Sequence, residues 1–401
     1  AHFSAERWPA FKADVAYFRV RENPKRWDET QTDHGFNGTP VWAIAGFALA
    51  NLAPASDGSI LLLTLIDPAY LAAALWLVRR AFGWRTAAIA MVVLATNFPS
   101  RFYWTGGAFL RWDWLFWMVA AVACLKLERP LLAGVALAYA ALLRVFPGLL
   151  VAGPVLAFAW DVWRTRRLHP AFVRFFAGAA IGAVLLVALS LPIVGVGAYR
   201  EFVQNSVKHT ATPLTNYMGL RTVVAYRPSE VGRYLRTDRD VDPWGKWKSA
   251  RLRAFDRAKP VFIVCFIGFA ALLALAVRGR PPWLAAALGA TTCAFAVELT
   301  SYYYAFVFAV ALAAHERTDG TKILLAITAA TGLIAWAPFP FLPTWWDEQY
   351  TAMSLVTVVG FVALLARFAF EPVPAPRPSA SRESEKLDAR RRDSVAAVRQ
   401  G

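Results

Sequence analysis

Cysteine and charge are both scarce in this chain of 401 residues. It contains three cysteines, Cys124, Cys265 and Cys293, each inside an apolar stretch with no CxxC or paired spacing. Because a disulfide framework or a thiolate metal site needs grouped cysteines, we expect these three to be small core residues. Charged residues make up 17% of the chain and apolar residues 58%, which excludes an ordinary soluble domain.

Motifs of several enzyme classes are also missing. The sequence has no P-loop, Gly-rich dinucleotide loop, zincin motif or cluster of Cys and His, which argues against an ATPase, a dehydrogenase or a metalloprotease. The pattern predicts no metal site and leaves a divalent ion on loop carboxylates open. The net charge is +16, but no basic stretch carries a nucleic-acid motif, so nucleic acid is not an expected partner.

Eleven apolar stretches, separated by links, organise the chain. A bilayer core of about 30 Å needs roughly 20 helical residues, so this repetition predicts one polytopic, all-α membrane body. The predicted spans cover about 60–80, 86–98, 113–127, 130–146, 148–163, 172–196, 260–278, 282–298, 301–314, 322–342 and 352–370.

Every second link between the stretches is basic. These links carry Arg79, Arg80 and Arg85, then Lys126 and Arg129, Arg164, Arg166 and Arg167, Arg278 and Arg280, Arg317 and Lys322, and finally Arg390 to Arg392. The positive-inside rule places them in the cytoplasm and the alternate links outside. The outer loop 197–259 is itself basic, with 13 Lys and Arg against 6 Asp and Glu, and this opposes the assignment.

Five segments follow from this layout. They are an extracytoplasmic segment at 1–59, membrane helices at 60–196, an extracytoplasmic loop at 197–259, membrane helices at 260–370 and a disordered cytoplasmic tail at 371–401. Within the first segment, the short apolar part 40–53 between Pro40 and Pro54 is expected as an interfacial or re-entrant helix. The chain starts without Met, and we expect a truncated start.

Several candidate catalytic residues lie in the predicted extracytoplasmic segment 1–59. The segment carries Asp14, Tyr17, Asp28, Glu29, Asp33 and His34 upstream of the short apolar part 40–53. A carboxylate in this segment suits a general base, and ordinary solvated loop charges are the alternative. Asp67, followed by Pro68 inside an apolar stretch, is open to a functional role or to a role in capping and kinking its helix.

Short motifs that resemble those of a known enzyme family select some of these residues. The run DVAYF at 14–18, followed by a Pro-led apolar helix, resembles the start of polyprenyl-phosphate-sugar-dependent glycosyltransferases of the GT-C superfamily. The nearest branch is family 87, which includes lipid-linked mannosyltransferases. LLRVFPGLLVAGPVL at 142–156 resembles the Lys-x-x-Pro turn of the family, and LTNYMGLRTVV at 214–224 resembles its outer-loop motif. Where relatives carry Gly-Gln-x-Asn, this chain has Leu-Arg-Trp-Asp at 110–113.

The resemblance implies a polytopic GT-C helical bundle with about eleven spans, a first span being absent. It also implies transfer of a sugar such as mannose from a polyprenyl-phosphate donor to a lipid or glycan acceptor, on the outer face of a bacterial plasma membrane and with inversion. In this scheme Asp14 is the general base. The expected ligands of the donor phosphate or substrate are Arg144, Arg221, Asn216, His209 and Tyr17.

Purely structural roles remain alternatives to these functional assignments. Arg144 could instead snorkel to the interface, and a lone loop histidine such as His209 is often only solvated. The aromatic groups at 102–104, 302–304 and 345–346 suit an interfacial belt, and some of them could line a sugar or lipid groove. A flippase or transporter of lipid-linked glycans, and a catalytically silent scaffold of the same fold, are the competing classes, although no internal repeat favours a transporter.

Overall fold

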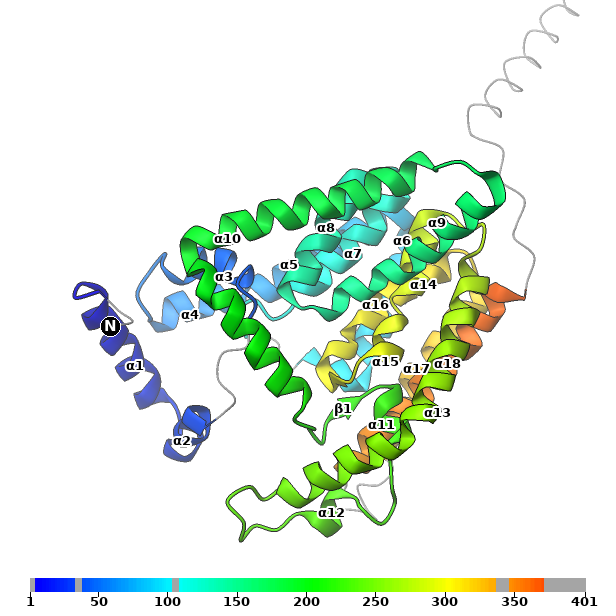
Figure 1. The fold of residues 1–401 in the computed structure, drawn as a ribbon. Helices are drawn as coiled ribbons and strands as arrows, with labels where there is room; N and C mark the ends of the chain where they lie inside the picture. Colours follow the sequence, from blue (N-terminus) through cyan, green and yellow to red (C-terminus); the bar gives the residue numbers. More distant parts are fainter. Residues whose placement is uncertain (1–3, 33–37, 103–107, 337–345, 371–401) are drawn as a thin grey trace, which may run out of the picture. The chain divides into compact units, whose positions relative to one another are not determined.

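The computed structural model describes residues 4–32, 38–102, 108–336 and 346–370, and nearly all regular structure in them is helical (Figure 1). The first half contains α1 (Arg7–Arg21), α2 (Pro24–Thr32), α3 (Trp42–Ala50), α4 (Asp57–Thr64), α5 (Ile66–Phe82), α6 (Trp84–Thr96), η1 (Phe98–Ser100), α7 (Asp113–Lys126), α8 (Pro130–Leu143), η3 (Phe146–Val151), α9 (Ala152–Thr165) and α10 (Pro170–Thr210). The second half contains α11 (Leu220–Val224), α12 (Gly232–Leu235), α13 (Gly245–Val277), α14 (Pro282–Gly289), α15 (Thr292–Ala296), η4 (Ser301–Phe306), α16 (Val307–Ala311), η5 (Leu312–His315), α17 (Thr318–Trp336) and α18 (Asp347–Ala369).

The predicted apolar stretches fall on these helices, which confirms the all-α fold class; residues 337–342 of one stretch lie outside the described residues. Five helical segments are long and apolar enough to cross a membrane: Asp57–Phe82, Phe146–Thr165, Pro170–Thr210, Gly245–Val277 and Asp347–Ala369. Shorter apolar helices lie between them in the sequence. The chain is therefore an integral membrane protein, as its composition predicts. The predicted tail at 371–401 lies outside the described residues.

Helices α10 and α13 are longer than the apolar stretches from which they were predicted. Helix α10 continues past residue 196 to Thr210, with a sharp bend visible in Figure 1. The bend lies at Gly195, whose φ of 74° is a left-handed conformation that favours glycine, three residues after Pro192. Helix α13 begins at Gly245, so its polar first half precedes the apolar part. Helix therefore occupies both ends of the predicted loop 197–259.

Glycine contacts let neighbouring helices approach closely. A Cβ on Gly134 of α8 would lie 2.0 Å from the carbonyl oxygen of Phe175 in α10. A Cβ on Gly153 of α9 would lie 1.8 Å from the carbonyl oxygen of Ala285 in α14. Such distances are impossible for real side chains, so these crossings depend on glycine, as is common between membrane helices.

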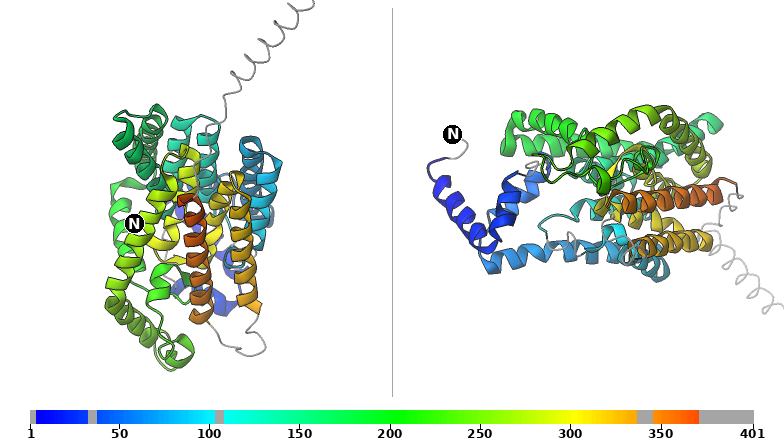
Figure 2. Two further views of the ribbon diagram at one scale, coloured as in Figure 1. Left: turned by 90° about the vertical axis from the view of Figure 1, so that its right-hand side faces the viewer. Right: turned by 90° about the horizontal axis from the view of Figure 1, so that it is seen from below.

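A small sheet and a short helix complete the frame around the site. Strand β1 (Tyr217–Met218) pairs antiparallel with β2 (Leu299–Thr300), and Tyr217 is opposite Thr300. This pairing brings the chain after α10 against the segment that follows α15. Helices α13 and α17 both pack on α18, and Figure 2 shows α17 and α18 side by side. The short apolar helix predicted at 40–53 is present as α3, and the Thr39 hydroxyl beside it donates to the carbonyl of Leu142.

Candidate functional site

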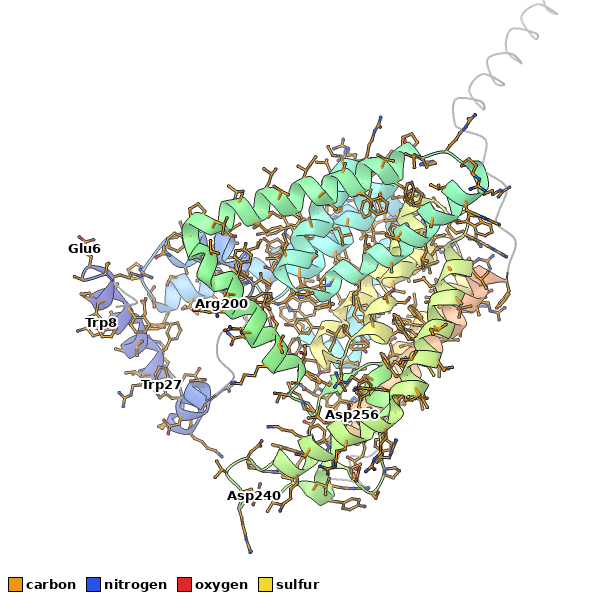
Figure 3. The ribbon with its side chains drawn as sticks, viewed as in Figure 1. Glu6, Trp8, Trp27, Arg200, Asp240 and Asp256 are labelled. Atoms are coloured by element: carbon orange, nitrogen blue, oxygen red, sulfur yellow. The ribbon has the colours of Figure 1, made fainter. Side chains whose placement is uncertain are left out.

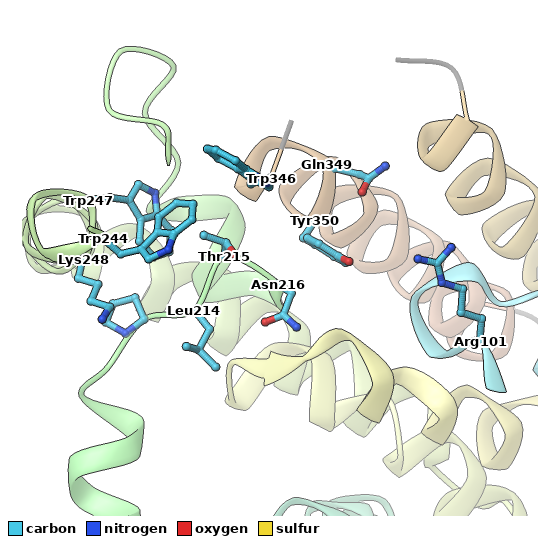
Figure 4. Close-up of a pocket in the computed structure, with 11 residues that line it drawn as sticks. Arg101, Leu214, Thr215, Asn216, Trp244, Trp247, Lys248, Trp346, Gln349 and Tyr350 are labelled. Atoms are coloured by element: carbon cyan, nitrogen blue, oxygen red, sulfur yellow. The ribbon is translucent and has the colours of Figure 1, made fainter. Parts of the chain in front are cut away.

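A cavity of about 520 Å³ opens beside the segment after α10 and the first turns of α13 and α18 (Figure 4). Four aromatic rings line it: Trp244, Trp247, Trp346 and Tyr350. Its polar lining includes the amides of Asn216 and Gln349 and the cations of Arg101 and Lys248. Of the residues that the resemblance selects, Asn216 is the one that lines this cavity.

The aromatic wall is held by one buried carboxylate. Asp347, 4% exposed, accepts hydrogen bonds from the backbone N–H of Gly232 and from the indole Nε1–H of Trp247, both at 2.9 Å. The Trp244 ring packs edge-on against Trp247 and Trp346, with centroid distances of 5.8 and 5.0 Å. Because both oxygens of Asp347 are occupied, the start of α18 fixes the position of Trp247 in the wall.

The polar side of the cavity has its own supports. The backbone carbonyl of Asn216 accepts a hydrogen bond from the Ser301 N–H at 2.9 Å, and this bond holds Asn216 against the segment after β2. Lys248 forms an ion pair with Asp242 at 2.8 Å. Arg101 lies over the Phe98 ring at 4.1 Å, and Figure 4 shows Tyr350 pointing toward the side of the cavity where Arg101 lies. The amide side chain of Asn216 points into the cavity.

Two arginines, Arg221 and Arg251, share the half-buried carboxylate of Glu298. Arg221 lies 3.4 Å from Oε2 of Glu298, and Arg251 lies 3.6 Å from Oε1 of the same residue. Thr222 donates to Glu298 at 2.8 Å, and Arg251 donates to the carbonyl of Thr222 at 2.9 Å. Two guanidinium groups on one carboxylate leave an excess positive charge, and Arg221 is the more exposed of the two, at 26% against 9%. The group can attract an anion.

The predicted residue His209 lies beside this group. Its Nε2 is 3.3 Å from the hydroxyl of Tyr217, the residue that follows Asn216. Burial raises the pKa of the Tyr217 phenol above its usual range, and the carboxylate of Glu298 adds to the rise. The phenol therefore stays protonated at neutral pH. His209, Asn216 and Arg221 thus lie along one short stretch around β1.

Arg144 lies in a different group of side chains, together with residues of 110–113, where this chain departs from the family motif. The backbone N–H groups of Arg111 and Trp112 donate to the buried carboxylate of Asp67 at 3.0 and 3.1 Å. The neighbouring Asp113 is also buried, and Arg144 is near enough for their opposite charges to interact. Asp67 therefore holds the chain just before α7, and among the described residues it caps no N–H of its own helix α5, which differs from the capping alternative. Asp113 adds a second buried carboxylate at the end of 110–113.

The predicted base and Tyr17 lie on α1. The carboxylate of Asp14 accepts one hydrogen bond, from Ala55 N–H at 3.4 Å. The Tyr17 hydroxyl donates to Asp57 at 2.6 Å, and Arg21 pairs with the same carboxylate at 2.8 Å. Across the described ranges, no hydrogen bond or ion pair joins Asp14 to any other residue that the resemblance selects. Asp33 and His34 lie outside those ranges.

Sequence reasoning missed much of this cavity. It left Trp346 open between an interfacial belt and a sugar or lipid groove, and it gave no role to Trp244, Trp247, Asp347 or Gln349. The spacing of Trp244 and Trp247, three residues apart at the start of a helix, was the available signal. The predicted absence of a metal site is not tested by the described residues, which hold no group of three His, Cys, Asp or Glu suited to a metal ion.

The fold and the cavity define an integral membrane protein with an aromatic-lined polar site. No family model and no curated protein matches the chain. Among solved structures, it is similar to the crystal structure of ArnT from Cupriavidus metallidurans bound to undecaprenyl phosphate. The identity is 14% over 83% of this chain and 67% of that chain, with a TM-score of 0.39. A likeness this distant assigns no function, and membership of family 87 stays a prediction.

Proposed function

We propose that this protein is an integral membrane glycosyltransferase that moves a sugar from a polyprenyl-phosphate donor to a lipid or glycan acceptor. The reaction takes place on the face that the charge pattern predicts to be extracytoplasmic. The sugar is a hexose such as mannose, and the anomeric centre is inverted. The single observation that carries the proposal is the chemistry of the cavity lined by Trp244, Trp247, Trp346 and Tyr350.

This lining suits a sugar that carries a phosphate. The apolar C–H face of a pyranose ring packs on an aromatic ring, and four such rings line the cavity. The amides of Asn216 and Gln349 can both donate to and accept from sugar hydroxyls. Arg101 and Lys248, the latter paired with Asp242, place positive charge at the cavity, which favours a substrate that carries a phosphate. Apolar surface with a few convergent polar groups is the usual composition of a small-molecule site.

The donor phosphate is assigned to the arginines that the resemblance selects. Arg221 carries the excess positive charge of the group around Glu298, which supports a role as an anion ligand. Arg144 shares its surroundings with Asp113, so part of its charge is already balanced. We assign Arg221 as the main phosphate ligand and Arg144 as a secondary one. Asn216 and His209 contact the sugar side, and Tyr17 contacts substrate from α1 through its ring, since its hydroxyl already donates to Asp57.

The transfer is a single displacement. Asp14 accepts the proton of the acceptor hydroxyl while the hydroxyl oxygen forms a bond to the anomeric carbon. The bond between that carbon and the phosphate oxygen breaks on the opposite face, and its electron pair leaves with the polyprenyl phosphate. Fixed cations stabilise the charge that the leaving phosphate gains. No nucleotide sugar takes part.

One assay separates this proposal from a flippase and from a silent scaffold. Membranes containing the full chain are incubated with radiolabelled polyprenyl-phosphate mannose and an extract of acceptor lipids, and new glycosidic products are separated by chromatography. The proposal predicts a new labelled glycolipid that control membranes lack. Movement of the labelled donor across sealed vesicles with no new glycosidic bond would identify a flippase. Neither transfer nor movement would identify a scaffold.

A further inference from the structure

The basic excess of the segment 197–259 has a structural explanation on α13. The segment carries 13 Lys and Arg against 6 Asp and Glu, and several of its cations form ion pairs. The paired cations are Arg221, Arg233, Arg236, Lys246, Lys248, Arg251 and Lys259. Arg253 and Arg257 are exposed, and across the described part of the chain they take part in no hydrogen bond or ion pair.

These two arginines lie on one helix face that continues into the apolar part of α13. They are four residues apart, so their side chains are neighbours on the helix surface. Val261, Val264 and Ile267 follow at steps of four, three and three residues, which keeps them on the same face, and they are 55%, 70% and 62% exposed. Figure 3 labels Asp256, which lies between the two arginines in sequence, partway along α13 from the loop at Asp240. Along α13, this face is therefore cationic at 253–257 and apolar from Val261 onward.

Helix geometry sets the depth of the arginines. With a rise of about 1.5 Å per residue, Arg257 lies about 6 Å and Arg253 about 12 Å before Val261 along the axis. The head-group layer of a bilayer is roughly 5 to 8 Å thick on each side of the hydrocarbon core. When the exposed valines face lipid tails, Arg257 lies at the level of the head groups, and the long side chain of Arg253 reaches that level from outside.

A second cavity adds to the same surface. It has a volume of about 420 Å³ and is lined by Lys246, Ser249 and Arg253, together with Glu230. Glu230 lies beyond ion-pair distance of Arg253, since no such pair occurs among the described residues. The cavity offers a phosphate group the guanidinium of Arg253 and the hydroxyl of Ser249, together with the ammonium of Lys246, which also pairs with Asp240 at 3.4 Å.

We propose that this surface, the α13 basic face formed by Lys246, Arg253 and Arg257, binds the phosphate head groups of anionic phospholipids of the bilayer. The occupant follows from charge complementarity and from the exposed valines on the same face, which place the cations beside lipid. The inference does not depend on the glycosyltransferase activity. Lipid contact also removes part of the conflict between the basic charge of 197–259 and its predicted extracytoplasmic position, because part of the excess charge then serves lipid binding.

The test measures lipid binding to the purified full chain in detergent. Native mass spectrometry counts the bound lipids during titration with phosphatidylglycerol or with phosphatidylcholine. The double variant Arg253→Gln with Arg257→Gln is compared with Arg239→Gln, which removes another exposed arginine that lacks an ion pair. Each cation near a charged membrane surface contributes about fivefold in affinity. We expect the double variant to bind phosphatidylglycerol about 25-fold more weakly, and Arg239→Gln to bind it within twofold of the wild type.

A second lipid and a charge-conserving variant complete the test. Phosphatidylcholine binding should be equal in all variants, and Arg253→Lys with Arg257→Lys should retain phosphatidylglycerol, because it keeps both charges. Equal phosphatidylglycerol binding by the wild type and the double glutamine variant would overturn the proposal. A tenfold or greater preference of the wild type for polyprenyl phosphate over phosphatidylglycerol, lost in the double variant, would also overturn it, because the face would then belong to the donor.

Discussion

Helix α1 and the aromatic cavity both carry residues that the family resemblance selects, but their contacts differ sharply. No residue of α1 is buried, and Asp14 accepts a single hydrogen bond of 3.4 Å. In the cavity, Trp247 is 2% exposed and Asp347 is 4% exposed, and two hydrogen bonds of 2.9 Å fix their positions. The proposed binding wall is therefore rigidly built, whereas the proposed base lies on a weakly anchored helix.

This difference assigns separate tasks to the two regions. A site that binds a sugar benefits from a wall that is in place before the ligand arrives, because less ordering is needed on binding. A catalytic base needs its final position only in the complex with both substrates. We therefore expect substitutions on α1 to change the rate of transfer and substitutions in the cavity to change binding.

The largest expected effect is on the chemical step. Asp14→Asn removes the proposed proton acceptor and should lower the rate of transfer by about 10²- to 10⁴-fold, with binding of the donor unchanged. The rate is measured with saturating polyprenyl-phosphate mannose. Asp161→Asn is the matched control, since Asp161 is also a half-buried aspartate and lies on α9. A rate for Asp14→Asn within threefold of the control would remove Asp14 from the mechanism.

The next effect concerns the stability of the cavity wall. Asp347→Asn keeps one acceptor oxygen, so either Gly232 N–H or Trp247 Nε1–H loses its partner. A buried donor without a partner costs about 1–3 kcal/mol, and the free energy of unfolding in detergent should fall by that amount. Asp57→Asn on the α1 side should leave the unfolding temperature unchanged, because the Asp57 side chain is 79% exposed. Equal effects of the two substitutions would abolish the contrast between the regions.

A smaller effect is expected for the donor phosphate. Arg221→Gln removes the more exposed guanidinium of the Glu298 group and should raise the KM for the lipid-linked donor about tenfold, with little change in kcat. Arg239→Gln, which removes an exposed arginine from the loop before α13, is the control. A lower kcat with an unchanged KM would show that Arg221 acts on the reaction and not on donor binding.

The smallest effect tests Tyr17. Its hydroxyl donates to the exposed carboxylate of Asp57, and this contact alone explains the position of the side chain. Tyr17→Phe should change transfer by no more than about twofold, because an exposed hydrogen bond contributes little. A loss of tenfold or more in the same transfer assay would show that the hydroxyl of Tyr17 contacts substrate.

The helical frame was predictable because it depends on local composition. Apolar stretches such as 172–196 and 260–278 identify α10 and α13 directly, since a long apolar segment in lipid satisfies its backbone hydrogen bonds internally as a helix. The polar ends of these helices, 197–210 and 245–259, were predicted as loop. Their sequences carry charges, and the helix is extended there by continuity with the apolar part, which hydropathy does not detect.

The site was less predictable because it is assembled from distant segments. Asn216, which lines the cavity, was selected from its motif, whereas Asp347 and Trp247 are separated by 100 residues and meet only in the fold. Nothing in the local sequence of Asp347 distinguishes it from a solvated carboxylate at a helix start. Arg221 was selected without its partner Glu298, which lies within an otherwise apolar stretch.

Binding of a soluble sugar phosphate tests the central claim most directly. Mannose 1-phosphate is titrated by calorimetry into the wild type, Trp244→Ala and Trp160→Ala, the last being a half-buried tryptophan of α9 outside the cavity. Loss of one stacking ring should weaken binding to Trp244→Ala about tenfold, while Trp160→Ala binds like the wild type. Equal binding by all three proteins, or no binding by the wild type, would contradict the assignment of this cavity to a phosphorylated sugar.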